Sequence, residues 1–318
     1  MRILNGEAVR QLLDMKSCIE AMRSAFAKTS AGAAEQPIRT ALRIPDKGLI
    51  GMMPGRFTDG SAFGIKVVSI FPGNFGKGVP THMGMVLLFD AENGVPRALI
   101  DAHAVTMIRT AAASAVATDV LARKEANSLA LLGYGDQAVS HLEAIKLVRQ
   151  LDKVVVWGRD RRRAEAFAAE HGAVVAESVE AAVNEAELVC TLTAAQTPIL
   201  FGRSLRPGQH VNAVGASLPN AAELDGEAVA KSRFFTDYRA SAEALAGEYR
   251  DAVSAGLITP EHLLGEIGDI LNGKVAGRDS AADITCFKSL GMAAEDLAAG
   301  ELILRRAEEQ NIGVEVDF

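Results

Sequence analysis

The chain has 318 residues, of which 49% are hydrophobic and 23% are charged, and its formal net charge is −7. This composition is ordinary for a globular protein, and the length leaves room for two domains. The negative charge argues against a nucleic-acid partner, because a nucleic-acid-binding domain needs a basic face.

The cysteines and the apolar segments predict a cytoplasmic protein. Cys18, Cys190 and Cys286 are scattered without CxxC spacing, which is typical of free thiols in a reducing compartment. No apolar run approaches the roughly 20 residues of a membrane span, and the N-terminus lacks a signal-peptide pattern, so we expect no membrane partner. The six histidines do not pair at ligand spacing, so we expect no metal site.

The first part of the chain predicts an α+β unit. Apolar residues recur at helical spacing over residues 6–32. Short apolar segments separated by glycine and proline then predict strands at Thr40–Ile44, Leu49–Met53, Phe63–Ile70, Gly84–Phe89 and Arg97–Asp101.

A long helix over residues 104–123 leads into a regular alternation of strands and helices. Helices are expected at 137–150 and 161–171, and strands at Leu129–Leu132, Lys153–Trp157, Leu188–Leu192, His210–Val214 and Arg233–Thr236. Such alternation implies right-handed crossovers and a doubly wound parallel sheet, an α/β domain that we place at residues 119–291. A last helix over 293–309 is expected to return to the first domain, which would then consist of residues 1–118 and 292–318.

The stretch Ser128–Ala138 has the pattern of a dinucleotide-binding turn. An apolar strand breaks at Gly133-Tyr134-Gly135, and a helical pattern follows at once. The first glycine permits a sharp turn, the second lets a pyrophosphate approach the backbone, and the helix N-terminus offers free N–H groups. The stretch therefore predicts a Rossmann-type domain.

The residues after the second strand of this domain bear on the choice of cofactor. An acid there would bind the ribose hydroxyls of NAD, whereas an arginine can hold the 2′-phosphate of NADP. Gly158 occupies the usual acid position, Asp160 follows slightly late, and Arg159 could grip a phosphate or stack on adenine. Because Asp160 would repel a phosphate, the sequence favours NAD, with NADP as the alternative.

Three cations in the first domain, Arg39, Lys66 and Arg109, are candidates for binding an anion. Lys66 lies within the apolar segment FGIKVVSI, so its ammonium either reaches out to solvent or points into a polar site. Arg109 opens an Ala-rich helical run, and if the helix begins only near Ile108, free N–H groups beside Arg109 would complete a site for a phosphate or a carboxylate. An exposed helical arginine is the alternative.

Six motifs in order resemble the ornithine cyclodeaminase/μ-crystallin family: FGIKVVSIFPGN, PTHMG, IRTAAASAVAT, LLGYGDQA, HVNAVGAS and TCFKSLGMAAED. The resemblance spans nearly the whole chain and implies a homodimer with a substrate-binding and dimerisation domain that the C-terminal helix completes. It implies that Arg39, Lys66 and Arg109 hold the carboxylate of the substrate. The resemblance also implies that the cofactor is contacted by Thr81, Arg109, Asp136, Gln137, Thr193, Val214, Gly215, Ala216, Ser217 and Ser289. Gly133 and Gly135 of the glycine turn and Arg159 and Asp160 after the second strand complete the set of candidate cofactor-binding residues.

Two departures from the cyclodeaminase pattern favour a simpler reaction. Ser217 stands where cyclodeaminases have a catalytic aspartate, and its hydroxyl cannot exchange protons near neutral pH as a carboxylate does. Gly51 replaces the acid that recognises the side-chain amine of ornithine. Nearby Arg56 would suit a second carboxylate if it faces the same pocket.

We therefore predict an oxidoreductase that transfers hydride from NAD(P)H to the C=N bond of a small 2-imino acid, giving an L-amino acid. Lys66 is the expected proton donor, since partial burial and neighbouring arginines would lower its pKa. Arg56 makes iminosuccinate a candidate substrate. The alternatives are an ornithine cyclodeaminase-type ammonia lyase, an alanine dehydrogenase and a catalytically silent NAD(P)-dependent binding protein.

Overall fold

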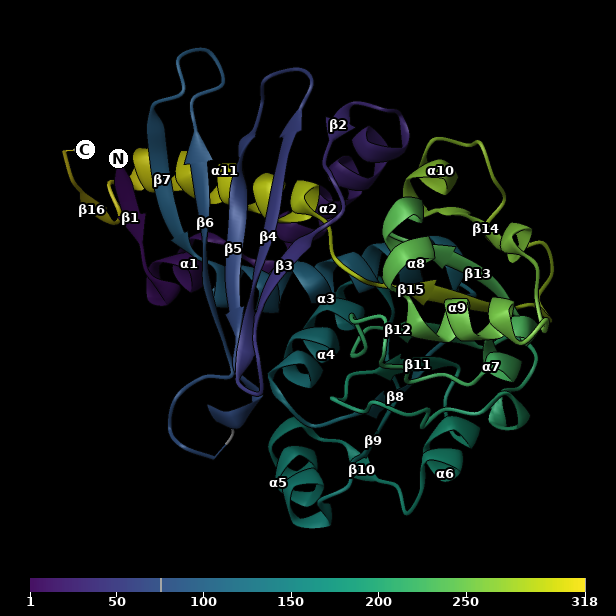
Figure 1. The fold of residues 1–318 in the computed structure, drawn as a ribbon. Helices are drawn as coiled ribbons and strands as arrows, with labels where there is room; N and C mark the ends of the chain where they lie inside the picture. The colour runs from purple at the N-terminus through teal and green to yellow at the C-terminus, as the bar shows by residue number, and fades with distance from the viewer. Residues whose placement is uncertain (75, 318) are drawn as a thin grey trace. The chain divides into compact units, whose positions relative to one another are not determined.

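The computed structural model describes residues 1–74 and 76–317 (Figure 1). The chain forms two compact units. Unit 1 comprises residues 1–109 and 291–318, and unit 2 comprises residues 110–290. The last helix belongs to unit 1, which is therefore discontinuous. The first boundary lies earlier in the chain than residue 118.

Unit 1 is built on sheet A, which has eight strands in the order β16-β1-β7-β6-β5-β4-β2, with β3 paired to β4. The β1–β7 pair is parallel and the other pairs are antiparallel. Asn5 and Asp14 cap the first two helices by accepting backbone N–H bonds. The elements are β1 (Arg2–Leu4), α1 (Gly6–Leu12), α2 (Met15–Ser30), β2 (Ala34–Glu35), β3 (Thr40–Ile44), β4 (Gly48–Phe57), β5 (Phe63–Ile70), η1 (Pro72–Asn74), β6 (His82–Phe89), β7 (Pro96–Asp101), α11 (Ala293–Gln310) and β16 (Val314–Glu315).

The two faces of sheet A differ in what covers them. Side chains alternate between the faces along each strand, and α11 packs on the inner face, against β4, β5 and β6. Leu49, Met53 and Val86 are buried there. The outer face is largely apolar and open to solvent. Its exposed residues include Ile50, Phe63, Met83 and Met85.

Helix α3 (Ala102–Leu121) begins in unit 1 and continues in unit 2. By length and composition it could span a bilayer, contrary to our expectation that no apolar run reaches that length, but 72% of its apolar window is buried in the protein. Ala111–Ala113 and Ala115–Ala117 are all completely buried. A helix that is apolar on every side suits the centre of a folded domain.

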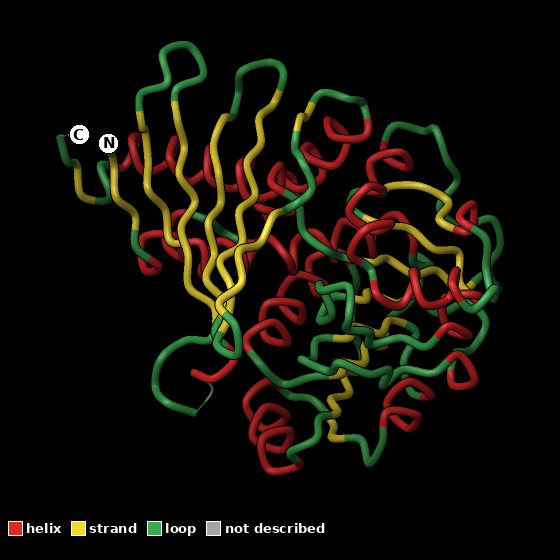
Figure 2. The backbone as a smooth tube through the Cα atoms, in the orientation of Figure 1, coloured by secondary structure: helices red, strands yellow, loops and turns green. Residues whose placement is uncertain are grey.

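Unit 2 is built on sheet B, whose eight strands are all parallel and follow the order β10-β9-β8-β11-β12-β15-β13-β14. The order reverses between β8 and β11, as in a doubly wound fold. Figure 2 shows the alternation of helices and strands. The elements are β8 (Ser128–Leu132), α4 (Asp136–Val148), β9 (Lys153–Trp157), α5 (Arg161–His171), β10 (Val174–Val175), α6 (Val179–Asn184), β11 (Leu188–Thr191), η2 (Gly202–Ser204), β12 (His210–Ala213), α7 (Gly226–Lys231), β13 (Ser232–Thr236), α8 (Arg239–Leu245), α9 (Gly247–Ser254), η3 (Pro260–His262), β14 (Leu263–Glu266), α10 (Ile267–Leu271) and β15 (Ile284–Lys288).

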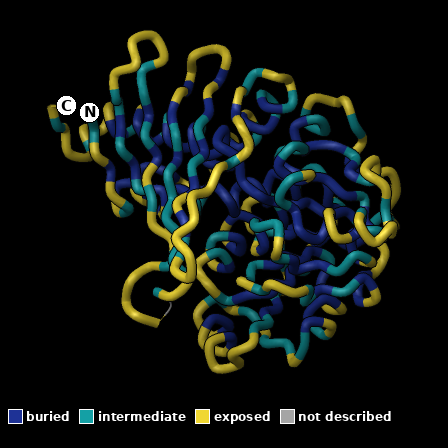
Figure 3. Tube along the Cα trace, viewed as in Figure 1, coloured by how far each residue is buried: buried dark blue, intermediate teal, exposed yellow. Residues whose placement is uncertain are grey.

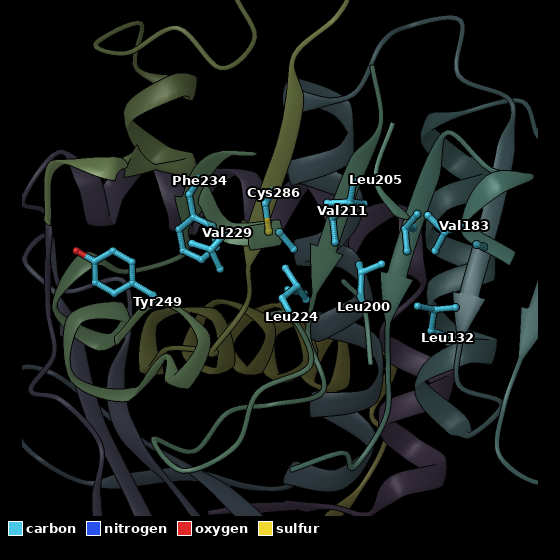
Figure 4. Packing of buried hydrophobic residues seen from close by; sticks show 14 of the residues in the cluster. Leu132, Val183, Leu200, Leu205, Val211, Leu224, Val229, Phe234, Tyr249 and Cys286 are labelled. Atoms are coloured by element: carbon cyan, nitrogen blue, oxygen red, sulfur yellow. The ribbon is translucent and has the colours of Figure 1, made fainter. Parts of the chain in front are cut away.

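The core of unit 2 fills the space between sheet B and its helices. Leu132, Val211, Phe234 and Cys286 come from four strands, and Tyr249 joins them from α9 (Figure 4). Strands β8, β11, β12 and β15 are buried almost throughout, and buried segments are drawn in dark blue in Figure 3. The predicted free thiols are confirmed, since all three cysteines are unpaired and buried.

Candidate active site

Lys66 lies on the inner face of sheet A with only 4% of its surface exposed. Its Nζ donates to Oδ1 of Asp296 at 2.9 Å and to Oγ1 of Thr106 at 2.6 Å. The Thr106 hydroxyl donates in turn to the carbonyl of Ala102. Because an ammonium has three N–H donors, these two hydrogen bonds leave the third N–H of Lys66 unused.

Arg109 shares a carboxylate with Lys66. Its Nε donates to Oδ1 of Asp296 at 3.0 Å, and its Nη1 donates to Oε2 of Glu295 at 3.0 Å. Glu295 and Asp296 lie in the first turn of α11, where the helix dipole favours negative charge. We call these four residues, Lys66, Arg109, Glu295 and Asp296, the charge cluster. All four are buried, and all belong to unit 1.

The environment of the charge cluster shifts the pKa values of Lys66 and Asp296. Burial lowers the pKa of Lys66 to about 8, because desolvation outweighs the attraction of Asp296. Burial by itself raises the pKa of Asp296, but the charges of Arg109 and Lys66 outweigh it and hold that pKa below its ordinary value. Asp296 is therefore ionised, while Lys66 can give up a proton near physiological pH.

Arg56 does not join this cluster, and the condition for its binding a second carboxylate, that it faces the same pocket as Lys66, is not met. In β4, Met53 pairs with Lys66 on the inner face, whereas Arg56 pairs with Phe63 on the outer face. The Arg56 guanidinium donates two hydrogen bonds to Glu35, at 2.8 and 2.9 Å. Its charge is thus already matched on the opposite side of the sheet.

The other candidates in unit 1 lie in connecting segments. Arg39 is half-buried between β2 and β3, and Thr81 is half-buried just before β6. The Thr81 hydroxyl lies 3.0 Å from Nδ1 of His82.

The candidate cofactor residues of unit 2 follow neighbouring strands at one edge of sheet B. The register aligns the strand ends in a row: Trp157, Leu132, Thr191, Ala213 and Lys288. Arg159, Gly133–Gln137, Thr193, Val214–Ser217 and Ser289 come just after these ends. Lys288 is the last residue of β15, so Ser289 is the first residue after that strand.

The turn after β8 fits a pyrophosphate. Gly133 has a φ of 133°, and a Cβ there would lie 2.7 Å from the carbonyl oxygen of Leu192. No atom lies within 4 Å of the place where a Cβ of Gly135 would be, so a ligand can approach the backbone. Helix α4 begins at Asp136 and no side chain caps its N-terminus, so the positive end of the helix dipole lies at this turn and favours an anion.

The adenosine end of the predicted site holds no carboxylate at the usual position. The Tyr134 ring occupies the space where a side chain of residue 158 would begin. Asp160 caps α5 by accepting the N–H of Arg163 at 3.2 Å, and Arg159 is exposed beside it.

A model of the ornithine cyclodeaminase/mu-crystallin family matches residues 2–311. The chain belongs to this family. Three relatives illustrate the similarity. The ketimine reductase mu-crystallin of Mus musculus is 37% identical over 94% of this chain and 95% of its own length.

Two solved structures have the same fold as this chain. The Δ1-pyrroline-2-carboxylate reductase of Thermococcus litoralis, in complex with NADH and L-proline, is 33% identical with a TM-score of 0.95, covering 99% of this chain and all of that one. The iminosuccinate reductase of Paracoccus denitrificans, in complex with NAD+, is 28% identical with a TM-score of 0.92, covering 100% of this chain and 99% of that one.

Sequence reasoning missed the acidic half of the charge cluster. Glu295 and Asp296 lie in the motif TCFKSLGMAAED, but we assigned them no role. Two adjacent acids at the start of a helix have an ordinary explanation, since they complement the helix dipole. Only the fold brings Asp296 to Lys66, 230 positions earlier in the chain, and Glu295 to Arg109.

Proposed function

We propose that the protein is an NADH-dependent reductase that converts a cyclic 2-imino acid into an L-amino acid. The observation that carries this proposal is the buried Lys66 ammonium, which has one free N–H and a pKa of about 8. Membership of a family of dinucleotide-dependent enzymes supports the proposal, as does the relative solved with NADH and L-proline.

The inner face of sheet A favours an apolar ring over a second carboxylate. Gly51 pairs with Val68, which pairs with Gly84, and all three share the inner face with Lys66. In β4, β5 and β6, which the structure describes in full, Lys66 is the only Lys, Arg, Asp or Glu on this face. Iminosuccinate was a candidate because Arg56 could bind its second carboxylate, but Arg56 lies on the opposite face of the sheet.

Reduction of a C=N bond needs one hydride and one proton. The reduced dinucleotide supplies the hydride when it is bound. Lys66 supplies the proton to the imine nitrogen, and Arg109 with Lys66 attracts the carboxylate and so fixes the distance and the face of the substrate. Asp296 then keeps the two cations together.

A screen of NADH oxidation at 340 nm tests this function. The substrates are Δ1-pyrroline-2-carboxylate, its six-membered homologue, and oxaloacetate, pyruvate and glyoxylate with ammonia. We expect the cyclic imines to give the highest kcat/KM. Preference for oxaloacetate or pyruvate would favour an iminosuccinate reductase or an alanine dehydrogenase. Formation of proline and ammonia from ornithine would favour a cyclodeaminase, and NADH binding without any turnover would favour a binding protein.

The pKa of Lys66 predicts the pH dependence of the reaction. Imine reduction needs the protonated ammonium, so kcat/KM should be level below pH 8 and fall as the pH rises through about 8. Oxidation of the amino acid needs the neutral amine, so its rate should rise through the same pH. Initial rates in both directions between pH 6 and 10 measure this, and a reduction rate that stays level up to pH 10 would contradict it.

We infer that the outer face of sheet A forms a homodimer interface. Ile3, Pro54, Ile65, Leu87 and Leu99 align across the sheet by strand register, so an apolar row crosses five strands. A contiguous apolar face that remains open to solvent is typical of an interaction site. The dimer that the family resemblance implies would cover it.

A charge placed on this face should dissociate the dimer. Met85, which is 45% exposed, is the site for a Met85→Glu substitution, because a second copy would bury the carboxylate without a partner. We expect light scattering to give the mass of a monomer for this variant. Leu147→Glu is the matched control, since Leu147 is 50% exposed on α4 of unit 2. Equal masses for both variants would contradict the interface.

A further inference from the structure

Glu223 joins two of the loops that follow the strands of sheet B. It lies between β12 and α7 and is completely buried. One carboxylate oxygen accepts from the backbone N–H and the hydroxyl of Thr193, at 2.7 and 2.6 Å. The other accepts from the Thr191 hydroxyl and the backbone N–H of Gly215, both at 2.6 Å. The ends of β11 and β12 are thus held by one side chain.

Lys288 holds the same region from another strand. Its Nζ donates to the carbonyl of Ala216 at 2.5 Å and to Oε1 of Glu248 at 2.9 Å. Lys288 and Glu248 have no exposed side-chain surface. Consecutive residues, Gly215 and Ala216, are therefore bound by two buried charged side chains.

The loops after β11 and β12 also contact each other directly at Gly215, where no larger residue fits. A Cβ at Gly215 would lie 2.1 Å from the carbonyl oxygen of Thr193 and 2.6 Å from Oε1 of Glu223. Burying charges is expensive, and apolar residues of similar volume often stabilise a core as well or better. A role in fixing the shape of the two loops would explain why charges stand at these positions.

The positions of the loops after β11 and β12 indicate which end of a bound dinucleotide they would contact. The fingerprint turn after β8 would hold the pyrophosphate, and β9 lies on the adenosine side. Strands β11 and β12 lie on the other side of β8. A dinucleotide bound across this edge would therefore have its nicotinamide end at residues 191–193 and 214–217.

We propose that Glu223 and Lys288 are positioning residues, which hold residues 191–193 and 214–217 in the shape that receives the nicotinamide end of the cofactor. The proposal rests on the proposed function, because it requires a nicotinamide dinucleotide on sheet B. It assigns no proton or hydride to either residue.

Binding of NADH and of ADP-ribose, which has no nicotinamide, tests the proposal. In Glu223→Gln the amide group cannot accept two of the hydrogen bonds, so the Kd for NADH should rise at least tenfold while the Kd for ADP-ribose changes less than twofold. The double variant K288M/E248Q removes both buried charges together, which avoids an orphan charge, and should show the same selective loss. Isothermal calorimetry measures both ligands.

Gln209→Met is the matched control, because it removes buried hydrogen bonds without adding a charge. Gln209 is 2% exposed, its side chain makes three hydrogen bonds, and it lies just before β12, at the opposite ends of the strands. We expect its Kd values to stay within twofold of wild type. Equal losses for NADH and ADP-ribose, or losses no larger than those of the control, would overturn the positioning role alone. A wild-type protein that binds ADP-ribose and NADH equally weakly, at millimolar Kd, would overturn the proposed function as well.

Discussion

Replacement of Lys66 by methionine is expected to lower kcat for imine reduction by about 10²- to 10⁴-fold, the range that a positioned acid or base contributes. Methionine keeps the length of the side chain and removes the ammonium, so the inner face of sheet A stays filled. The substituted enzyme would still deliver hydride, but the imine nitrogen would depend on water for its proton. Steady-state turnover at saturating NADH measures this effect.

Cofactor affinity separates a role in chemistry from a role in folding. Lys66 belongs to unit 1, and the fingerprint turn belongs to unit 2. We therefore expect the Kd for NADH, measured by fluorescence titration, to change little in Lys66→Met. Lys28→Met is the matched control, because it removes a lysine of the same unit that pairs with Asp59 at 2.7 Å. Wild-type turnover in Lys66→Met would remove Lys66 from the mechanism.

The error on Arg56 shows how a strand boundary decides a functional prediction. The sequence predicts a strand that ends at Met53, because Pro54 and Gly55 are typical turn residues, and this boundary puts Arg56 in a loop. In the structure β4 continues through Pro54 to Phe57. Gly51 and Arg56 are five positions apart on one strand and so face opposite sides. In a loop, the Arg56 side chain could have pointed to either side of the sheet.

Local patterns identified Lys66, Arg109 and the glycines of the fingerprint turn, because a lysine in an apolar strand and a glycine turn before a helix are visible in a few residues. Their partners are not local. Asp296 lies 187 positions from Arg109, and Glu248 lies 40 positions from Lys288. The position of β15 between β12 and β13 is likewise set by packing across the whole sheet. Sequence patterns therefore identify charged residues and glycines in unusual local settings, but not the distant residues that form ion pairs with them.

Asp296→Asn is expected to reduce the free energy of unfolding by about 3–5 kcal/mol, the usual penalty for removing one partner of a buried ion pair. The carboxylate accepts from both Lys66 and Arg109, and the amide would leave two buried cations with Glu295 as their only acidic neighbour in the cluster. Urea denaturation at pH 7 measures the change. Glu301→Gln is the control, since Glu301 pairs with Arg97 at 3.0 Å but keeps 21% of its side chain exposed. We expect it to lose less than about 1 kcal/mol.

The pH dependence of that difference identifies its electrostatic origin. The folded state lowers the pKa of Asp296, so its contribution to stability is present above the ordinary carboxyl pKa of about 4 and is lost as the pH falls through the lower folded value. The stability gap between wild type and Asp296→Asn should thus be full at pH 7 and close in acid. The same substitution removes the negative charge that supports the Lys66 ammonium, so the fall in imine reduction should begin below pH 8. An unchanged pH profile would mean that Asp296 stabilises the fold without acting on Lys66.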